Sequence, residues 1–575
     1  MTNTLDPRLG LLLVCPLLAT AAAPAFAQRA SPVELSRTHA PEATTADITA
    51  RDVMTRTYII ADDSMEGRDT GRRGGVRSAN YIAHELARLG LEPAGDHGTF
   101  LQAIPWVSRT PDSTSTLQIG ATSLHWGTDF LLIPKLGFAL ALGGQPFGGA
   151  FRGENVSSVY GGRIGETTIA PAEARGRVVV FGTEASSPSF AFWQRDNLRR
   201  YAEATAIVVA TLDLGAPAAY RATRETYWDS ASTGEARPLT VIAMTNASAE
   251  RFFGRPLAQV AVGTIGVSMS GRATFLDRPT EAPAYNVVGI LRGTDAKLRN
   301  SFVAVGAHHD HIGISRPVDH DSVRAFNTVA RQRGADDRPR PATTEESARI
   351  KVILDSLHAV HPVRLDSINN GADDDGSGSV LELEIAESFA RSAQRPKRSL
   401  LFVWHTAEEK GLYGAQYFSD HATVPRDSII AQVNMDQMGR GDPIDNPPGG
   451  ANSLVVIGSR RLSTELGDLA ERVNQKPEHG FRFDYAFDAN GDPTNGYCRS
   501  DHYMYARYGI PVVFFSAAAW HIDYHMVSDE PQYIAYDRMT HIGKYIRDLI
   551  GAVANLDHRP VVDKPKPDPD AVCRQ

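Results

Sequence analysis

The fold of this chain is decided by the stretch FVAVGAHHDH at residues 302–311, where an apolar run leads into three histidines and an aspartate. The run Phe302 to Val305 has the length and composition of a buried strand. In open α/β sheets, the carboxyl ends of such strands border the crevice in which ligands bind. The sequence therefore makes three side chains candidate metal ligands: His308, His309 and His311.

The spacing of His308 and Asp310 also suits a metal site. A metal-bound imidazole usually donates its other N–H group to a carboxylate, and that bond fixes the tautomer of the ring. Asp310 is the candidate partner. A cluster of surface histidines is the plainer alternative for this segment.

Four further segments carry acidic or histidine residues: GADDDGSG at 371–378, HTAEEKGL at 405–412, VNMDQMG at 433–439 and DYHMVSDE at 523–530. Strand-like apolar runs lead into three of them, at 400–404, 429–433 and 511–515. The second segment instead opens a helical pattern, so capping is one explanation for its aspartates. Three consecutive carboxylates exceed what a cap needs, which favours a bound cation.

Together the five segments resemble the co-catalytic dizinc exopeptidases of peptidase family M28, over roughly residues 283 to 550. The resemblance implies two Zn²⁺ ions held by five ligands: His308 and Asp436 for one, Glu409 and His525 for the other, and Asp374 between them. It further implies that Glu408 is the general base and that Asp310 orients His308.

The activity that the resemblance implies is hydrolysis of N-terminal residues from peptides, with Glu408 acting on a water shared by the two ions. Three alternatives stay open: a carboxypeptidase of the same fold, a glutaminyl cyclase, and a binding protein without catalysis. The complete ligand set argues against the last two, and the setting NMDQMG argues against the first. The chain contains no HExxH motif of other metallopeptidases.

We expect an α/β fold, in which a mixed sheet of the zinc exopeptidase type is flanked by helices and carries a β-rich inserted domain. The predicted segments are a signal peptide at 1–27, the N-terminal part of the peptidase domain at 28–109, an inserted domain resembling protease-associated domains at 110–279, the zinc peptidase core at 280–556 and a disordered tail at 557–575.

One stretch departs from the family pattern. Residues 316–369 separate the first two ligand segments by more than we expect, and they include a charged, helix-like run at 345–358. This insertion is either an exposed surface excursion or a lid that shapes the substrate pocket. Its charge favours the excursion.

The first residues of the chain indicate an exported protein. Gly10 to Ala23 is too short to span a bilayer, and Ala25 to Ala27 has the small-x-small pattern of a signal-peptide cleavage site. We therefore expect a periplasmic or extracellular protein without a transmembrane segment after cleavage.

A net charge of −8 over 575 residues gives no basic footprint for nucleic acid, so peptides are the expected partners. The pairing of Cys498 with Cys573 and the oligomeric state stay open.

Overall fold

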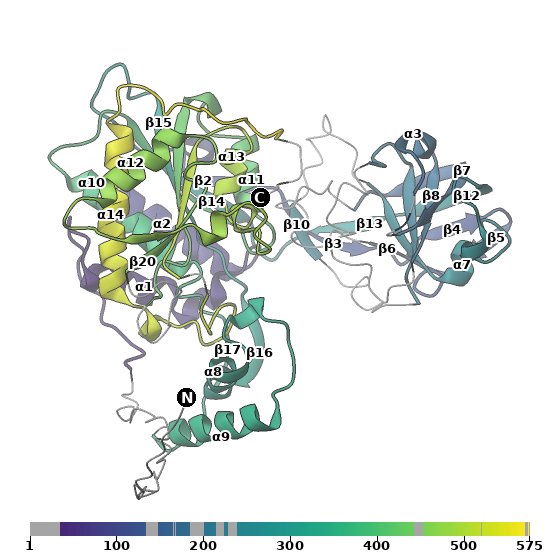
Figure 1. Cartoon of the computed structure of the whole chain (residues 1–575), viewed down its shortest axis with the longest axis horizontal. Coiled ribbons are helices and arrows are strands. Elements are labelled where there is room, and N and C mark those ends of the chain that lie inside the picture. Colours follow the sequence, from purple (N-terminus) through teal and green to yellow (C-terminus); the bar gives the residue numbers. More distant parts are fainter. Residues whose placement is uncertain are drawn as a thin grey trace, which may run out of the picture.

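The computed structural model describes residues 35–133, 148–164, 166, 168–183, 200–213, 224–227, 239–360, 362–441, 452–518, 520–569, 573 and 575. The predicted signal peptide at 1–27 lies outside these residues. Within them, no helix combines the length and the apolar composition needed to cross a membrane. Figure 1 shows a large body of helices around a sheet, a second body rich in strands beside it, and a small projection below.

The large body is built on a nine-stranded mixed sheet in the order β1-β14-β18-β15-β19-β22-β20-β21, with β2 also paired to β14. Its strands are β1 (Glu92–Pro93), β2 (Leu101–Ile104), β14 (Ala284–Leu291), β15 (Phe302–His308), β18 (Ser399–His405), β19 (Ile429–Met435), β20 (Ser453–Ile457), β21 (Arg482–Asp484) and β22 (Val512–Ser516). The prediction of a mixed α/β fold is confirmed.

The four middle strands, β18, β15, β19 and β22, run parallel to one another. Each is buried along its whole length, as the uninterrupted apolar runs predicted. Because they are parallel, their carboxyl ends meet at one edge of the sheet. The residues that follow the apolar runs are thereby gathered at that edge.

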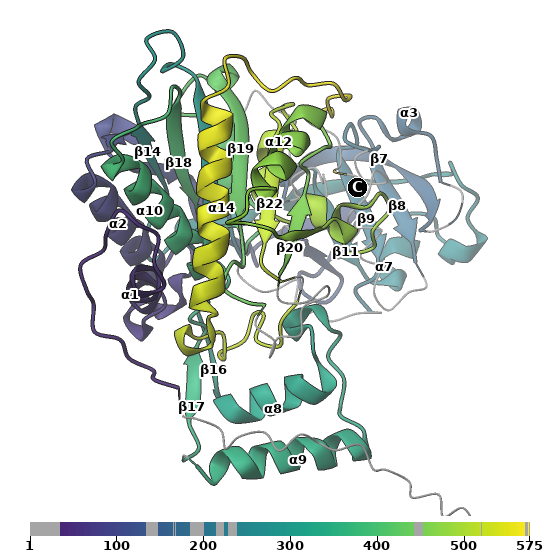
Figure 2. The same ribbon diagram turned by 60° about the vertical axis from the view of Figure 1, so that its left-hand side comes forward.

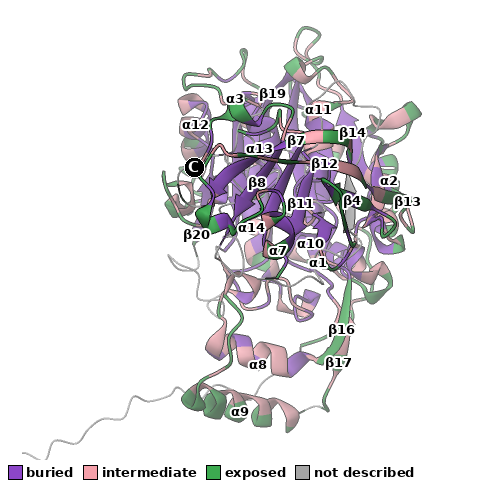
Figure 3. Ribbon diagram, turned by 90° about the vertical axis from the view of Figure 1, so that its right-hand side faces the viewer, coloured by how far each residue is buried: buried purple, intermediate pink, exposed green. Residues whose placement is uncertain are grey.

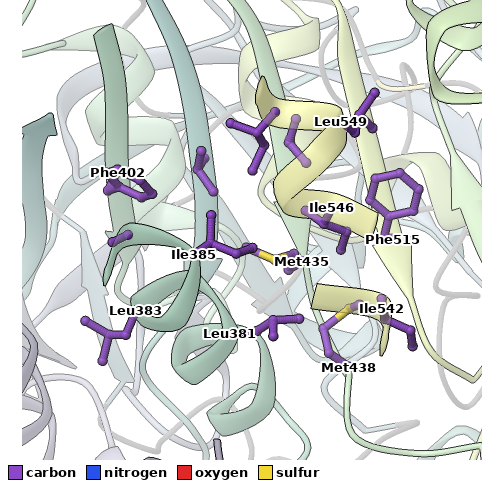
Figure 4. Close-up of a cluster of buried hydrophobic side chains, with 14 of the residues drawn as sticks. Leu381, Leu383, Ile385, Phe402, Met435, Met438, Phe515, Ile542, Ile546 and Leu549 are labelled. Carbon is purple, nitrogen blue, oxygen red and sulfur yellow. The ribbon is translucent and has the colours of Figure 1, made fainter. Parts of the chain in front are cut away.

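Helices cover both faces of this sheet, and successive residues of β18 pack alternately into two different cores. On β18, Phe402 and Trp404 face a core shared with α1 (Ala50–Ile60), α2 (Arg73–Arg88), α10 (Gly376–Arg391), α12 (Thr464–Asn474) and α14 (Tyr536–Ala554). Leu401 and Val403 face the core of α11 (Tyr413–Asp420) and α13 (His502–Ala506). Figure 2 shows α14 crossing the sheet, and Figure 4 shows side chains of α10 and α14 meeting those of the strands.

The second body contains an eight-stranded sheet in the order β5-β4-β12-β7-β8-β9-β11-β6. Its elements are β4 (Thr116–Ile119), β5 (Thr122–Leu124), β6 (Phe130–Leu132), β7 (Phe151–Arg163), α3 (Pro171–Ala174), β8 (Val178–Gly182), β9 (Ala206–Ala210), β11 (Val241–Met244), α7 (Asn246–Glu250) and β12 (Ile265–Ala273). A three-stranded sheet of β10 (Arg224–Tyr227), β3 (Trp106–Pro111) and β13 (Phe275–Pro279) lies between the two bodies (Figure 1). The strands agree with a β-rich segment at 110–279, and its assignment as a protease-associated domain stays a prediction.

The projection is the insertion at 316–369. It consists of β16 (Ile314–Asp319), α8 (His320–Ala330), α9 (Thr344–His358) and β17 (Leu365–Ile368), with β16 and β17 paired antiparallel. Helix α9 has no buried residue, and Figure 3 shows that α9 and β16 carry much exposed surface. This end of the insertion is the surface excursion that its charge predicted.

The C-terminal segment differs from the disordered tail that we expected at 557–575. Its described residues lie against the large body: Asp563 and Lys564 donate backbone hydrogen bonds to the carbonyl of Leu462. Cys573 forms a disulfide with Cys498, 75 residues earlier. The prolines and charges of the tail indicated that it has no core of its own, but local composition does not reveal attachment to a distant surface.

Candidate metal centre

Four of the expected site residues lie at or just after the ends of neighbouring parallel strands. His308 is the last residue of β15, Asp436 directly follows β19, and Glu408 and Glu409 follow β18 after a short link. The backbone N–H of His309 donates to the carbonyl of His405, which keeps the ends of β15 and β18 together. The strand order therefore brings these side chains to one edge of the sheet.

Asp374 lies between two groups of possible ligands. It precedes α10, and its Oδ1 lies 3.3 Å from Nε2 of His308 while its Oδ2 lies 2.9 Å from Nε2 of His525. His308 also approaches Asp436, with Nε2 3.7 Å from Oδ1. On the other side, Nε2 of His525 lies 2.9 Å from Oε2 of Glu409. The five residues expected as ligands thus meet in one buried cluster, with Asp374 in contact with both histidines.

The ligand types and spacings fit divalent metal ions. Two groups of atoms each lie within 4.8 Å of one another: those of His311, Asp374, Glu409 and His525, and those of His308, Asp375 and Asp436. Four ligands about 2.1 Å from a tetrahedral ion would be about 3.4 Å apart, close to the separations above. Imidazole and carboxylate groups are also the ligands that zinc prefers in catalytic sites.

Two neighbours have contacts that the sequence did not define. His311 is buried, and its Nδ1 lies 2.7 Å from Oε1 of Glu409, so it orients that carboxylate or joins its group of ligands. The carboxylate of Asp375 is occupied by the backbone: it accepts hydrogen bonds from the N–H groups of His308, Gly378 and Gln437. Asp375 therefore ties the ligand segments together.

Asp310 makes different contacts from the ones expected. Nδ1 of His308 lies 3.1 Å from the backbone oxygen of Asp310 and 3.6 Å from its Oδ1. The carboxylate instead accepts hydrogen bonds from the N–H of Glu408 and the hydroxyl of Thr70, both at 3.1 Å. Asp310 thus orients His308 mainly through its carbonyl, because its side chain holds the loop that carries Glu408.

Glu408 lies beside the ligand cluster at the edge of a pocket. Its Oε2 is 3.9 Å from Nε2 of His308, and its side chain is 12% exposed. Burial raises the pKa of Glu408 well above its ordinary value, and the nearby carboxylates of Glu409 and Asp436 raise it further. A raised pKa makes this carboxyl group a better proton acceptor than an ordinary glutamate, which suits it to proton transfer.

Two of the ligand carboxylates, Asp374 and Glu409, show the opposite tendency, whereas burial raises the pKa of Asp436. Although burial opposes ionisation, hydrogen bonds from His308 and His525 lower the pKa of Asp374 well below its ordinary value. Burial likewise opposes ionisation of Glu409, yet the charge of His525 and the hydrogen bonds from His311 and His525 lower its pKa to about 2. Both carboxylates are therefore stabilised by positive charge beside them, which is what a bound cation supplies.

Arg68 holds the backbone around the centre, although sequence analysis assigned no role to the lead-in segment SMEGRDTG in which it lies. Its guanidinium is fully buried and donates to five backbone carbonyls: those of Ile60, His309, Asn370, Gly371 and Asp374. The carbonyl of His309 lies next to His308, those of Asn370, Gly371 and Asp374 belong to the loop of Asp374, and that of Ile60 ends α1. Nothing in the local pattern distinguishes such an arginine from a surface one, because its partners are backbone atoms far along the chain.

A pocket opens beside Glu408, and Asp374, Asp436 and His525 also line it. Apolar side chains line much of it: Val455, Ile457, Phe487, Phe514 and Trp520. Arg333 and Asp336 also line it, and both come from the insertion. The insertion is therefore exposed at α9 and lines the pocket at 333–336. The two alternatives, a surface excursion and a segment that shapes the substrate pocket, each describe one part of it.

Comparison with known proteins identifies related sequences. The model of peptidase family M28 matches residues 346–550. A probable leucine aminopeptidase from Arthroderma benhamiae is 28% identical over 230 residues, which cover 38% of this chain and 57% of the relative. Leucine aminopeptidase 1 from Coccidioides posadasii is 30% identical over 181 residues, covering 30% of this chain and 43% of the relative. The chain therefore spans about half the length of these curated relatives.

Among solved structures, an aminopeptidase from Aneurinibacillus sp. strain AM-1 is similar over 90% of this chain and 97% of its own, with a TM-score of 0.43 and 16% identity.

The segment matched by the family model contains Asp374, Glu408, Glu409, Asp436 and His525, while His308 and Asp310 precede it. The model of peptidase family M28 thus matches the part of this chain that contains four of the five predicted ligand-bearing segments.

Proposed function

We propose that this chain is an exported, metal-dependent exopeptidase that removes N-terminal residues from peptides and uses two zinc ions. The observation that carries the proposal is the placement of Asp374 between His308 and His525, with a further carboxylate on each side and Glu408 beside the pocket. The family match and the names of the curated relatives support a peptidase of the aminopeptidase type.

Each residue of the site has a role that follows from its contacts. Zinc ions bound here would acidify a water molecule and polarise the scissile carbonyl. Glu408 takes the proton of the attacking water and later gives it to the departing amine, which its raised pKa favours. Asp310 holds the backbone of Glu408 in place, and Ser500 donates a hydrogen bond of 2.8 Å to Oδ2 of Asp436.

The pocket supports an apolar first residue. Part of its wall is aliphatic and aromatic, and the carboxylates that would surround the reacting bond line the same pocket. An apolar side chain that enters such a pocket gains about 25 cal/mol for each Å² removed from water. This agrees with the leucine preference that the names of the relatives state for those proteins.

The test is release of the first residue from short peptides, offered with a free and with an acetylated N-terminus, by the zinc-loaded protein. We expect hydrolysis of the free peptides only. Glu408→Gln should lower turnover by about 10²–10⁴-fold while the zinc content stays the same. Glu345→Gln, which changes an exposed glutamate on α9, is the matched control and should behave like the wild type.

Three other results of this experiment would each indicate a different function. Release of the last residue, whether or not the N-terminus is acetylated, would indicate a carboxypeptidase of the same fold. Cyclisation of N-terminal glutamine without hydrolysis would indicate a glutaminyl cyclase. A zinc-loaded protein that leaves every peptide intact would indicate a binding protein.

A further inference from the structure

The insertion is fixed to the loop that carries His525. The N–H of Ala335 donates to the carbonyl of Tyr524, the residue before His525, at 3.0 Å. Gly334 has a φ of +54°, and a Cβ atom there would lie 2.6 Å from the same carbonyl oxygen, so the close approach requires glycine. The segment 333–336 is therefore held at the pocket, and the side chains on either side of Gly334 have defined positions.

Two arginines line this part of the pocket: Arg499 is paired with a carboxylate, and Arg333 lies over an indole ring. Arg499 forms a two-pronged ion pair with Asp336, with both N–O distances at 3.1 Å. Arg333 instead lies over the indole ring of Trp520, 3.5 Å from its centre. Among the described residues, no carboxylate lies within ion-pair distance of Arg333, and its Nε is buried without a hydrogen-bond partner.

The pocket therefore carries charges of both signs. Its lining includes the carboxylates of Asp374, Glu408 and Asp436 and, from the insertion, the guanidinium of Arg333, which has no carboxylate partner within ion-pair distance among the described residues. The indole ring fixes the plane of this guanidinium through a cation–π contact and leaves its N–H groups free to bind a ligand. A carboxylate matches two parallel N–H donors better than any other group of a peptide does.

We propose that Arg333 binds a carboxylate of the peptide substrate and thereby sets the specificity of the enzyme. The carboxylate belongs either to the C-terminus of a short peptide or to an acidic side chain, and both sources present the same group to Arg333. This inference rests on the proposed peptidase function. It gives the insertion a role in substrate selection that the ligand residues alone do not provide.

The experiment compares kcat/KM within two pairs of peptides. Leu-Ala and Leu-Ala-amide differ only in the terminal carboxylate, while Glu-Ala-amide and Gln-Ala-amide differ only in the side-chain carboxylate. In one pair, we expect the wild type to favour the member with the carboxylate by roughly ten- to a hundred-fold, as for a charge-assisted hydrogen bond. The pair that shows the preference identifies the source of the carboxylate.

Variants assign the preference to the arginine. Arg333→Gln should reduce the ratio within the responding pair to about one, and Arg333→Lys should restore part of it. Arg338→Gln, an exposed arginine five residues away that does not line the pocket, is the control and should keep the wild-type ratio. Asp336→Asn releases Arg499 from its ion pair, so this variant should increase the ratio.

The outcomes separate this inference from the proposed function. Hydrolysis of all four peptides without a preference in either pair would overturn the role of Arg333 and leave the peptidase assignment intact. A wild-type ratio in Arg333→Gln would also overturn it. If the zinc-loaded wild type hydrolysed none of the four, the proposed function itself would fail, and this inference with it.

Discussion

Replacing Arg68 by lysine tests whether a buried cation organises the metal centre. The guanidinium donates to five backbone carbonyls, whereas an ammonium group has three donors at a single point. At least two carbonyls would therefore lose their donor. A hydrogen bond to a charged group contributes about 1.5–3 kcal/mol, so Arg68→Lys should lower the free energy of unfolding by about 3–6 kcal/mol. This is a large fraction of the about 5–15 kcal/mol that stabilises a folded domain.

The same variant should bind zinc more weakly. Arg68 donates to the carbonyls of His309, Gly371 and Asp374, and these residues lie in the loops that supply His308 and Asp374 as ligands. Loss of a residue that orients ligands typically costs about 10–100-fold in metal affinity. Chelator competition measures this affinity, and urea denaturation measures the stability.

The matched control is Arg77→Lys, because Arg77 is 46% exposed and makes only local contacts with Glu66 and Ser64. It should change the free energy of unfolding by less than about 0.5 kcal/mol. The reasoning is refuted if Arg68→Lys unfolds within about 1 kcal/mol of the wild type and keeps the same affinity for zinc.

Three further outcomes are expected. Glu409→Ala should lose bound zinc, measured as metal content after gel filtration, and added zinc should raise its melting temperature less than that of the wild type; a variant that keeps two equivalents contradicts the ligand assignment. Cys573→Ala opens a link across 75 residues and should lower the free energy of unfolding by about 4 kcal/mol; an unchanged denaturation midpoint would show that the disulfide adds nothing. Burial opposes ionisation of Glu530, but His320 and Arg364 lower its pKa to about 2. Because a depressed pKa stabilises the fold above the unfolded value of 4.5, this contribution, on the order of 3 kcal/mol, should be lost as pH falls from about 5 to 2. Urea titrations of the wild type and Glu530→Gln across this range should converge at the acid end, and parallel curves would rule the effect out.

The sequence was most informative where a local pattern has a direct geometric consequence. The apolar runs beginning at Phe302, Leu400 and Ile429 became β15, β18 and β19, which lie side by side and parallel. A residue that follows such a run must lie at the ligand-binding edge of the sheet. For this reason His308 and Asp436 could be placed in the candidate site before their neighbours were known.

The sequence was least informative where a residue acts through a distant surface. Gly334 and Arg333 lie in a charged stretch whose composition indicates solvent exposure, and the exposed helix α9 agrees with that. Their position at the pocket depends on the contact with Tyr524, which is separated from them by almost 200 residues. No periodicity or motif encodes such a contact, because its two sides belong to different elements.

The carboxylates around the centre fall into an outer and an inner group with different sources of positive charge. The outer carboxylates, Asp523 and Asp529, both pair with Arg440 at 3.1 Å, and Asp523 also pairs with Arg324. Asp529 in turn accepts hydrogen bonds from the backbone N–H groups of Asp373 and Asp374. The protein thus neutralises the outer group with its own arginines and uses it to hold the ligand loop.

The inner carboxylates, Asp374, Glu409 and Asp436, have no such arginine. Among the described residues, their ion pairs within 4 Å are made with histidines alone. Buried carboxylates repel one another. Although burial opposes it, the surrounding carboxylates raise the pKa of His308 and of His525 well above the ordinary value, so protonated imidazoles offset that repulsion. Two divalent cations would take the place of these protons and leave the imidazoles neutral and able to act as ligands. The arginines therefore fix the shape of the site, while the positive charge at its centre is exchangeable between protons and bound metal.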